Sequence, residues 1–184
     1  MRGWYGAPCT GEPLDLIRPL RDRSKPHARA ALKGMLRRGS LSVRLAVLVS
    51  TTGMTGFLPR AGWLGGLVGT LLAGALSGLE QWMLLVVWGV VGYVAIRSLG
   101  PLGDASEINV DEAVGAYMAA ALSGARGAEL ALTFVLFAIL DFLKPFPANR
   151  LDLREDALGI MGDDAVAGLV AGLLAAGVFA LTRS

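Results

Sequence analysis

Residues 131–144 read Ala-Leu-Thr-Phe-Val-Leu-Phe-Ala-Ile-Leu-Asp-Phe-Leu-Lys, a nearly unbroken apolar run that leads directly into Asp141 and Lys144. A run of this length and composition predicts a helix in apolar surroundings. Asp141 falls near the C-terminal end of that helix, where a negative charge opposes the helix dipole. Lys144 lies three residues later on the same face and can neutralise it. A surface ion pair or a functional site accounts for these two charges.

The composition is typical of a membrane protein. The chain has 184 residues, of which 54% are hydrophobic and 25 are glycine. This length suits one domain with a tail, and glycine is more frequent in transmembrane helices than in soluble ones. Cys9 is the only cysteine and His27 the only histidine. An intramolecular disulfide and a metal site built from cysteine or histidine are therefore excluded.

The charges are unevenly distributed along the chain. Residues 1–44 hold ten Lys and Arg against three Asp and Glu, whereas residues 45–184 hold seven against twelve. We therefore divide the chain into a basic polar N-terminal tail, residues 1–40, and an apolar domain, residues 41–184. The positive-inside rule predicts a cytoplasmic N-terminus. Aromatic residues do not interleave with the basic ones, so no nucleic-acid partner is predicted.

Long apolar segments rich in Ala, Leu and Gly favour helices over strands. They lie at residues 41–58, 61–79, 82–96, 113–123, 128–143 and 165–182. The predicted fold is an all-α, multi-helix, membrane-associated bundle. Segments 61–79 and 165–182 are long enough to span a bilayer, whereas 113–123 is predicted to be buried or re-entrant. Glycines four residues apart, such as Gly65 with Gly69 and Gly168 with Gly172, predict closely packed helices.

Two pairs of adjacent acids precede apolar segments. Asp111 and Glu112 follow Asn109, which predicts a helix start with Asn109 as N-cap and Glu112 in a capping box. Asp163 and Asp164 equally resemble an N-cap and a first-turn acid. One acid suffices to cap a helix, however, and two adjacent like charges repel each other. A functional role for both pairs is the alternative to capping.

Six charged residues thus stand at the ends of apolar segments, where a bundle can gather them at one membrane face. A charge at mid-membrane depth costs roughly 2.5–3.5 kcal/mol, so intramembrane ionisable residues are functional candidates. Carboxylates without His or Cys favour a hard cation such as Mg²⁺. The pattern predicts phosphoryl transfer or hydrolysis near a membrane surface. The candidate catalytic residues are Asp111, Glu112, Asp141, Lys144, Asp163 and Asp164, and the five acids are the candidate metal ligands.

Three motifs in this chain resemble, in the same order, those of the phosphatidylglycerophosphatase A family. They are Val110-Asp111-Glu112-x-x-Gly115, Asp141-x-x-Lys144-Pro145-x-Pro147 and Gly159-Ile160-Met161-x-Asp163-Asp164-x-x-Ala167-Gly168. The resemblance covers roughly residues 41–184. It implies an all-α bundle in the bacterial inner membrane and Mg²⁺-dependent hydrolysis of phosphatidylglycerophosphate to phosphatidylglycerol and phosphate, a step of phospholipid biosynthesis.

The chain departs from the family pattern in three places. Ala138 stands where the family usually has arginine, Pro59–Gly62 replaces a Pro-Gly-Thr-x-Gly-Ser run, and Asp156–Leu158 replaces His-Gly-Gly. If those groups bind phosphate, activity or substrate choice has changed here. Arg60 and Arg150 are candidate substitutes.

Two other functions remain open at this stage. The first is a non-catalytic or substrate-shifted membrane protein that uses the acids for cation binding or packing. The second is a phosphatidyl-group transferase, but such enzymes carry an Asp-Gly-x2-Ala-Arg arrangement that this chain lacks.

Overall fold

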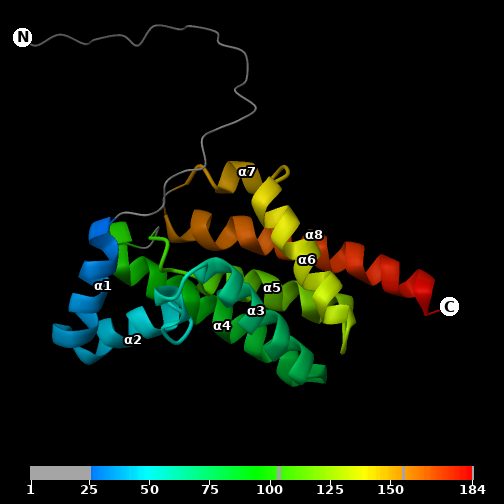
Figure 1. The fold of residues 1–184 in the computed structure, drawn as a ribbon, viewed down its shortest axis with the longest axis horizontal. Coiled ribbons are helices and arrows are strands. Elements are labelled where there is room, and N and C mark those ends of the chain that lie inside the picture. Colours follow the sequence, from blue (N-terminus) through cyan, green and yellow to red (C-terminus); the bar gives the residue numbers. More distant parts are fainter. Residues whose placement is uncertain (1–25, 103–104, 155, 184) are drawn as a thin grey trace, which may run out of the picture.

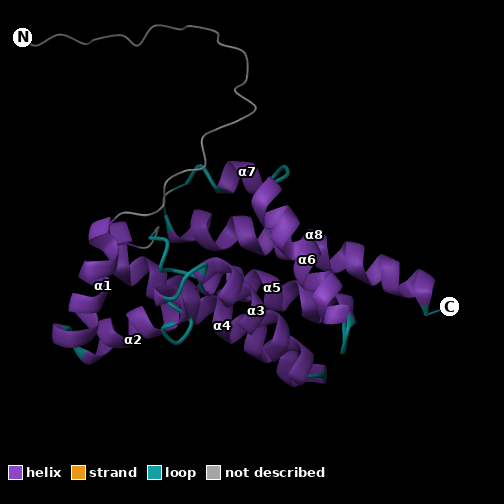
Figure 2. Cartoon of the chain, in the orientation of Figure 1, coloured by secondary structure: helices purple, strands orange, loops and turns teal. Residues whose placement is uncertain are grey.

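The computed structural model describes residues 26–102, 105–154 and 156–183, and this part of the chain is helical without a strand (Figures 1 and 2). The prediction of an all-α fold is confirmed. The elements are α1 (Pro26–Arg38), α2 (Leu41–Ser50), η1 (Thr55–Phe57), α3 (Ala61–Ala75), α4 (Gly78–Leu99), η2 (Gly100–Leu102), α5 (Val110–Ser123), α6 (Glu129–Leu143), α7 (Ala148–Leu151) and α8 (Ala157–Thr182).

Helix α5 is the central helix of the bundle and packs most extensively against α8 and α3 (Figure 1). Its own buried residues are mostly small, and the facing helices contribute glycines. A Cβ atom at Gly69 of α3 would lie 1.9 Å from the carbonyl oxygen of Ala113, and one at Gly168 of α8 would lie 2.2 Å from that of Gly115. The backbones of α3, α5 and α8 are therefore in direct contact, as the glycine spacing predicts.

Buried polar side chains also connect α5 to α4 and α3 by hydrogen bonds. The buried Tyr117 hydroxyl donates to the carbonyl oxygen of Gln81 at 2.8 Å, and the Gln81 amide donates to that of Ala73 at 2.8 Å. These two bonds join α5, α4 and α3 in series. Each satisfies a buried polar group that would otherwise cost free energy.

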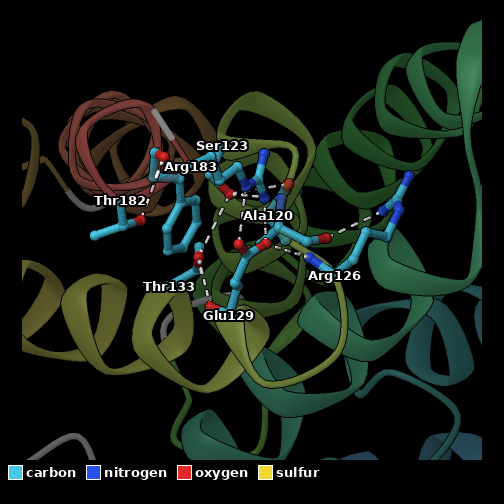
Figure 3. A network of polar contacts seen from close by, with 9 residues as sticks. Ala120, Ser123, Arg126, Glu129, Thr133, Thr182 and Arg183 are labelled. Atoms are coloured by element: carbon cyan, nitrogen blue, oxygen red, sulfur yellow. Dashed lines mark hydrogen bonds and ion pairs between the residues drawn. The ribbon is translucent and has the colours of Figure 1, made fainter.

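A second polar network closes the end of the bundle where α5 finishes and α6 begins (Figure 3). Glu129 at the start of α6 accepts from the backbone N–H of Arg126 at 3.1 Å and from Arg183 Nε, beyond the end of α8, at 2.9 Å. Ser123 and Thr133 share a hydrogen bond of 3.4 Å beside it. This network fixes α6 and α8 relative to each other at the end remote from Asp111.

The outer surface of the bundle is apolar over several helices. Large hydrophobic side chains are exposed at Trp63, Leu67 and Leu71 of α3, Met83, Val87, Val90 and Val94 of α4, Val135 and Ile139 of α6, and Leu169, Leu173 and Leu174 of α8. Among the described helices, α4 and α8 are long and apolar enough to cross a membrane, and most of each lies outside the buried core.

The structure corrects one predicted span and relocates part of the tail. Residues 61–79 do not form one helix, because α3 ends at Ala75, Leu76 is extended, and α4 begins at Gly78. Residues 26–38, which the sequence places in the basic tail, form α1, and its Ala28 and Leu32 are buried in a core cluster with residues of α2 and α4. The remainder of the tail, residues 1–25, lies outside the described residues.

The glycine contacts lead to a matched pair of substitutions within α8. We expect Gly168→Ala to destabilise the protein by about 1–3 kcal/mol, because the added methyl group meets backbone rather than a movable side chain. Gly177→Ala meets no atom within 4 Å, so we expect it to be neutral or to stabilise by up to about 1 kcal/mol. Thermal and denaturant unfolding of the detergent-purified variants measures both effects. Equal stability of the two variants contradicts the packing described here.

Candidate functional site

Asn109 precedes α5 and connects the start of this helix to neighbouring segments through hydrogen bonds. Asn109 occupies the N-cap position without a side-chain capping bond. The side-chain amide of Asn109 donates instead to Thr55 Oγ1 at 3.0 Å and to the Ala61 carbonyl oxygen at 2.8 Å. Its backbone N–H donates to the Ser50 carbonyl oxygen at 3.0 Å. Because that N–H is already bonded, Glu112 cannot complete the predicted capping box. The predicted helix start with Asn109 at the N-cap position is confirmed, but the capping box does not form, so Glu112 needs another explanation.

Three carboxylates from two helices converge at this point. Asp111, Glu112 and Asp164 each place one carboxylate oxygen within 4.8 Å of the others. Asp111 and Asp164 are buried, and Glu112 Oε2 has no hydrogen-bond partner among the described residues. The close approach of α5 and α8 brings them together, because a Cβ at Gly115 would lie 2.6 Å from the Asp164 carbonyl oxygen. We call these three residues the carboxylate cluster.

Asp163 and Asp164 do not cap α8. The helix begins at Ala157, and Asp156 is its N-cap, accepting from the Gly159 N–H at 2.9 Å. Asp163 and Asp164 therefore lie in the second turn and are both buried. The local explanation for these acids fails, so their charges require partners from elsewhere in the fold.

Lys144 supplies the positive charge for Asp163. Its Nζ donates to Asp163 Oδ2 in a short ion pair and to Asp152 Oδ1 at 2.7 Å. Lys144 ends α6 in the left-handed conformation, with φ of 44°. Such a conformation costs a non-glycine residue of order 1–3 kcal/mol and is often found at functional sites. The sequence spacing pairs Lys144 with Asp141, whereas Asp152 reaches the lysine only through the fold of the α7 segment.

Asp141, near the end of α6, lines one cavity together with Glu112. Its negative charge acts on both Glu112 and Asp164. Burial raises the pKa of the Glu112 carboxyl well above its ordinary value, and the nearby charges of Asp111 and Asp141 raise it further. Negative charge thus accumulates around Glu112 at a cost that a bound cation would remove.

Two cavities of about 370 Å³ each meet at Glu112. The apolar cavity has Asp141 and Glu112 as its only acidic lining residues; its other walls are Gly62, Trp63, Phe134, Val135, Phe137, Ala138, Ile139, Phe142 and Leu143. The polar cavity is lined by Arg29, Gly56, Leu58, Arg60, Ala61, Gly62, Trp63, Ala105, Ser106, Glu107, Ile108 and Glu112.

Gly62 lines both cavities beside Glu112. A Cβ at Gly62 would lie 2.6 Å from Glu112 Oε1, so the absence of a side chain leaves room for the carboxylate. Of the two arginines considered as substitutes for the family pattern, Arg60 lines the polar cavity. Arg150 instead lies over the Phe146 ring, 5.2 Å from its centroid, and lines neither cavity.

The carboxylate cluster fits a divalent cation. All its donors are carboxylate oxygens, which hard cations prefer. Two buried acceptors have no hydrogen-bond partner within the described part of the chain: Glu112 Oε2 in the cluster and Asn109 Oδ1 two residues before Asp111. A cation there would satisfy Glu112 and offset the mutual repulsion of the acids.

The chain was compared with known proteins. A family model described as phosphatidylglycerophosphatase A matches residues 48–179. Searches of curated proteins and of solved structures found no match. The matched range includes all six sequence-predicted site residues and begins after α1. The chain belongs to the phosphatidylglycerophosphatase A family.

Proposed function

We propose that this protein hydrolyses the phosphate monoester of phosphatidylglycerophosphate, in a Mg²⁺-dependent reaction that yields phosphatidylglycerol and phosphate. The observation that carries the proposal is the convergence of Asp111, Glu112 and Asp164 beside an apolar cavity, in a chain of this family. The cluster suits the polar head of a lipid phosphate, and the cavity suits its hydrocarbon.

In this proposal Asp111, Glu112 and Asp164 hold the cation. A Mg²⁺ held by these residues would supply charge stabilisation for the phosphoryl oxygens and would make a water molecule more acidic. Because Gly62 has no side chain, it leaves room for the Glu112 carboxylate, which lines both cavities. The close contact at Gly115 holds Asp164 against α5, so the three ligands are positioned by rigid backbone rather than by flexible loops.

Asp141 is the proposed general base. It lines the apolar cavity together with Glu112, and its carboxylate can accept a proton from an attacking water on the side where the substrate lies. Asp163 and Lys144 act as a positioning pair. Lys144 neutralises Asp163, whose Oδ1 accepts from the backbone N–H of Asp164 at 3.1 Å. This bond connects the ion pair to a proposed ligand of the cation.

The proposed location is the cytoplasmic membrane of a bacterium, with the N-terminus on the cytoplasmic side. The support is the apolar outer surface of α3, α4, α6 and α8, the candidate spans α4 and α8, and the basic residues at the N-terminal side of the chain. A phospholipid substrate then reaches the apolar cavity from the surrounding lipid.

The first test is metal dependence combined with ligand substitution. We expect detergent-purified protein to release phosphate from phosphatidylglycerophosphate with Mg²⁺, and to lose release in EDTA until Mg²⁺ is restored. Glu112→Gln and Asp164→Asn each remove a proposed ligand charge, so we expect release to fall at least about 100-fold. Glu80→Gln, an exposed acid in the first turn of α4, is the control and should keep wild-type activity.

Equal release with Mg²⁺ and with EDTA, or full activity of Asp164→Asn, contradicts this mechanism. Cation binding without turnover of any lipid phosphate supports the non-catalytic alternative instead. Because Asp164 is itself buried, folding of each variant is checked by thermal unfolding before activity is compared.

The second test concerns the apolar cavity. Ala138→Phe places a bulky ring in this cavity, so we expect KM for a long-chain substrate to rise about tenfold, equivalent to about 1.4 kcal/mol. A short-chain analogue should be affected much less. Leu132→Phe adds a ring on the exposed face of the same helix outside both cavities and is the control. An equal effect of Ala138→Phe on both substrates contradicts the assignment of this cavity to lipid hydrocarbon.

A further inference from the structure

The polar cavity lies beside the carboxylate cluster and shares Glu112 with it. Its walls come from α1, the η1 turn, the start of α3 and the segment before α5. Two of its lining side chains are arginines, Arg29 from α1 and Arg60 from the residue before α3. Positive groups are thus collected next to a proposed cation site, where a phosphate would need them.

Arg29 is held at the cavity by the backbone of the η1 turn. Its Nη2 donates to the Phe57 carbonyl oxygen in a short hydrogen bond. A guanidinium carries five N–H donors in a planar fork that matches phosphate, and this bond uses one of them. α1 is itself anchored, because Ala28 and Leu32 on either side of Arg29 are buried. The backbone that carries Arg29 is therefore anchored in the core, while the Arg29 side chain itself is exposed.

The first turn of α3 adds backbone donors to the same cavity. Ala61, Gly62 and Trp63 all line it, and Arg60 at the N-cap position makes no side-chain capping bond. The first N–H groups of a helix have no acceptor within that helix, and together with the helix dipole they favour anions. Two arginines and a helix N-terminus therefore line one cavity of about 370 Å³, which is partly open to solvent.

Two glutamates in the cavity wall limit what can bind. Glu112 belongs to the carboxylate cluster, and Glu107 accepts from the Ser106 hydroxyl at 3.3 Å. No ion pair within 4 Å joins either arginine to either glutamate in the described part of the chain. The arginines are therefore not there simply to neutralise the glutamates. An anion in this cavity is favoured most when a cation occupies the carboxylate cluster and offsets Glu112.

We propose that the polar cavity is the phosphate subsite of this protein, in which Arg29, Arg60 and the N-terminus of α3 bind the dianionic phosphoryl group beside a divalent cation. The assignment of that phosphoryl group to a lipid substrate rests on the proposed function. Arg29 precedes residues 48–179, so family membership alone does not predict its part in the subsite. α1 thereby becomes a component of the site rather than part of a tail.

The test measures binding of inorganic phosphate to the full chain in detergent micelles, by calorimetric titration with Mg²⁺ present. We expect Arg29→Gln and Arg60→Gln each to raise Kd at least tenfold, and the double variant to raise it further. Arg38→Gln, an exposed arginine at the end of α1 outside both cavities, should leave Kd unchanged. Omitting Mg²⁺ should weaken phosphate binding to the wild-type protein. Kd values within twofold of wild type for both cavity variants overturn the proposal.

Arg29→Gln also removes a hydrogen bond to η1, so Arg60→Gln, which breaks no side-chain hydrogen bond within the described residues, keeps the test decisive if the first variant unfolds. Phosphate binding is independent of turnover, which separates the two proposals. Arginine-dependent phosphate binding without hydrolysis of phosphatidylglycerophosphate overturns the proposed function and supports the subsite. Mg²⁺-dependent hydrolysis with unchanged Kd and unchanged product inhibition in Arg60→Gln overturns the subsite alone.

Discussion

Direct backbone contact between α5 and its two neighbours is the constraint on which the rest of the structure depends. Gly69 and Gly168 allow α3 and α8 to touch the carbonyl groups of Ala113 and Gly115. The same contact carries Asp164 to the acids at the start of α5, and it carries the beginning of α3 to Glu112 through Gly62. Side chains at these glycines would separate the helices and disperse the site, so packing and chemistry depend on the same small residues.

The electrostatic organisation follows from that packing. Lys144 is assigned to Asp163 and Asp152, at one edge of the acidic region, and Asp111, Glu112 and Asp164 are left clustered at its centre. Burial in an apolar bundle makes this arrangement unfavourable unless a cation joins it.

Periodicity and composition were enough to predict an all-α bundle, because helix formation depends on the chain's own local pattern. Of the six charged residues that the sequence singles out, Asp111, Glu112 and Asp164 converge in the fold. The errors concern features set by distant contacts. Asn109 stands at the N-cap position of α5, but its Nδ2 group donates to Thr55 and Ala61 and its Oδ1 makes no capping bond. Asp163 also resembles a cap, but Asp156 starts α8 almost two turns earlier. Asp152 and Arg29 carry no sequence signal of their own, because only the fold brings them to the site.

The length of α8 has a consequence for where the chemistry takes place. Asp164 lies about 10 Å along the helix axis from Ala157, the first residue of α8. About 27 Å of uncharged helix then follows before Thr182. That remainder is close to the hydrocarbon thickness of a bilayer, about 30 Å. If α8 crosses a membrane, its length places the carboxylates at the level of the lipid phosphates. A phospholipid would then meet the site by lateral diffusion within its own leaflet, without being lifted out of the membrane.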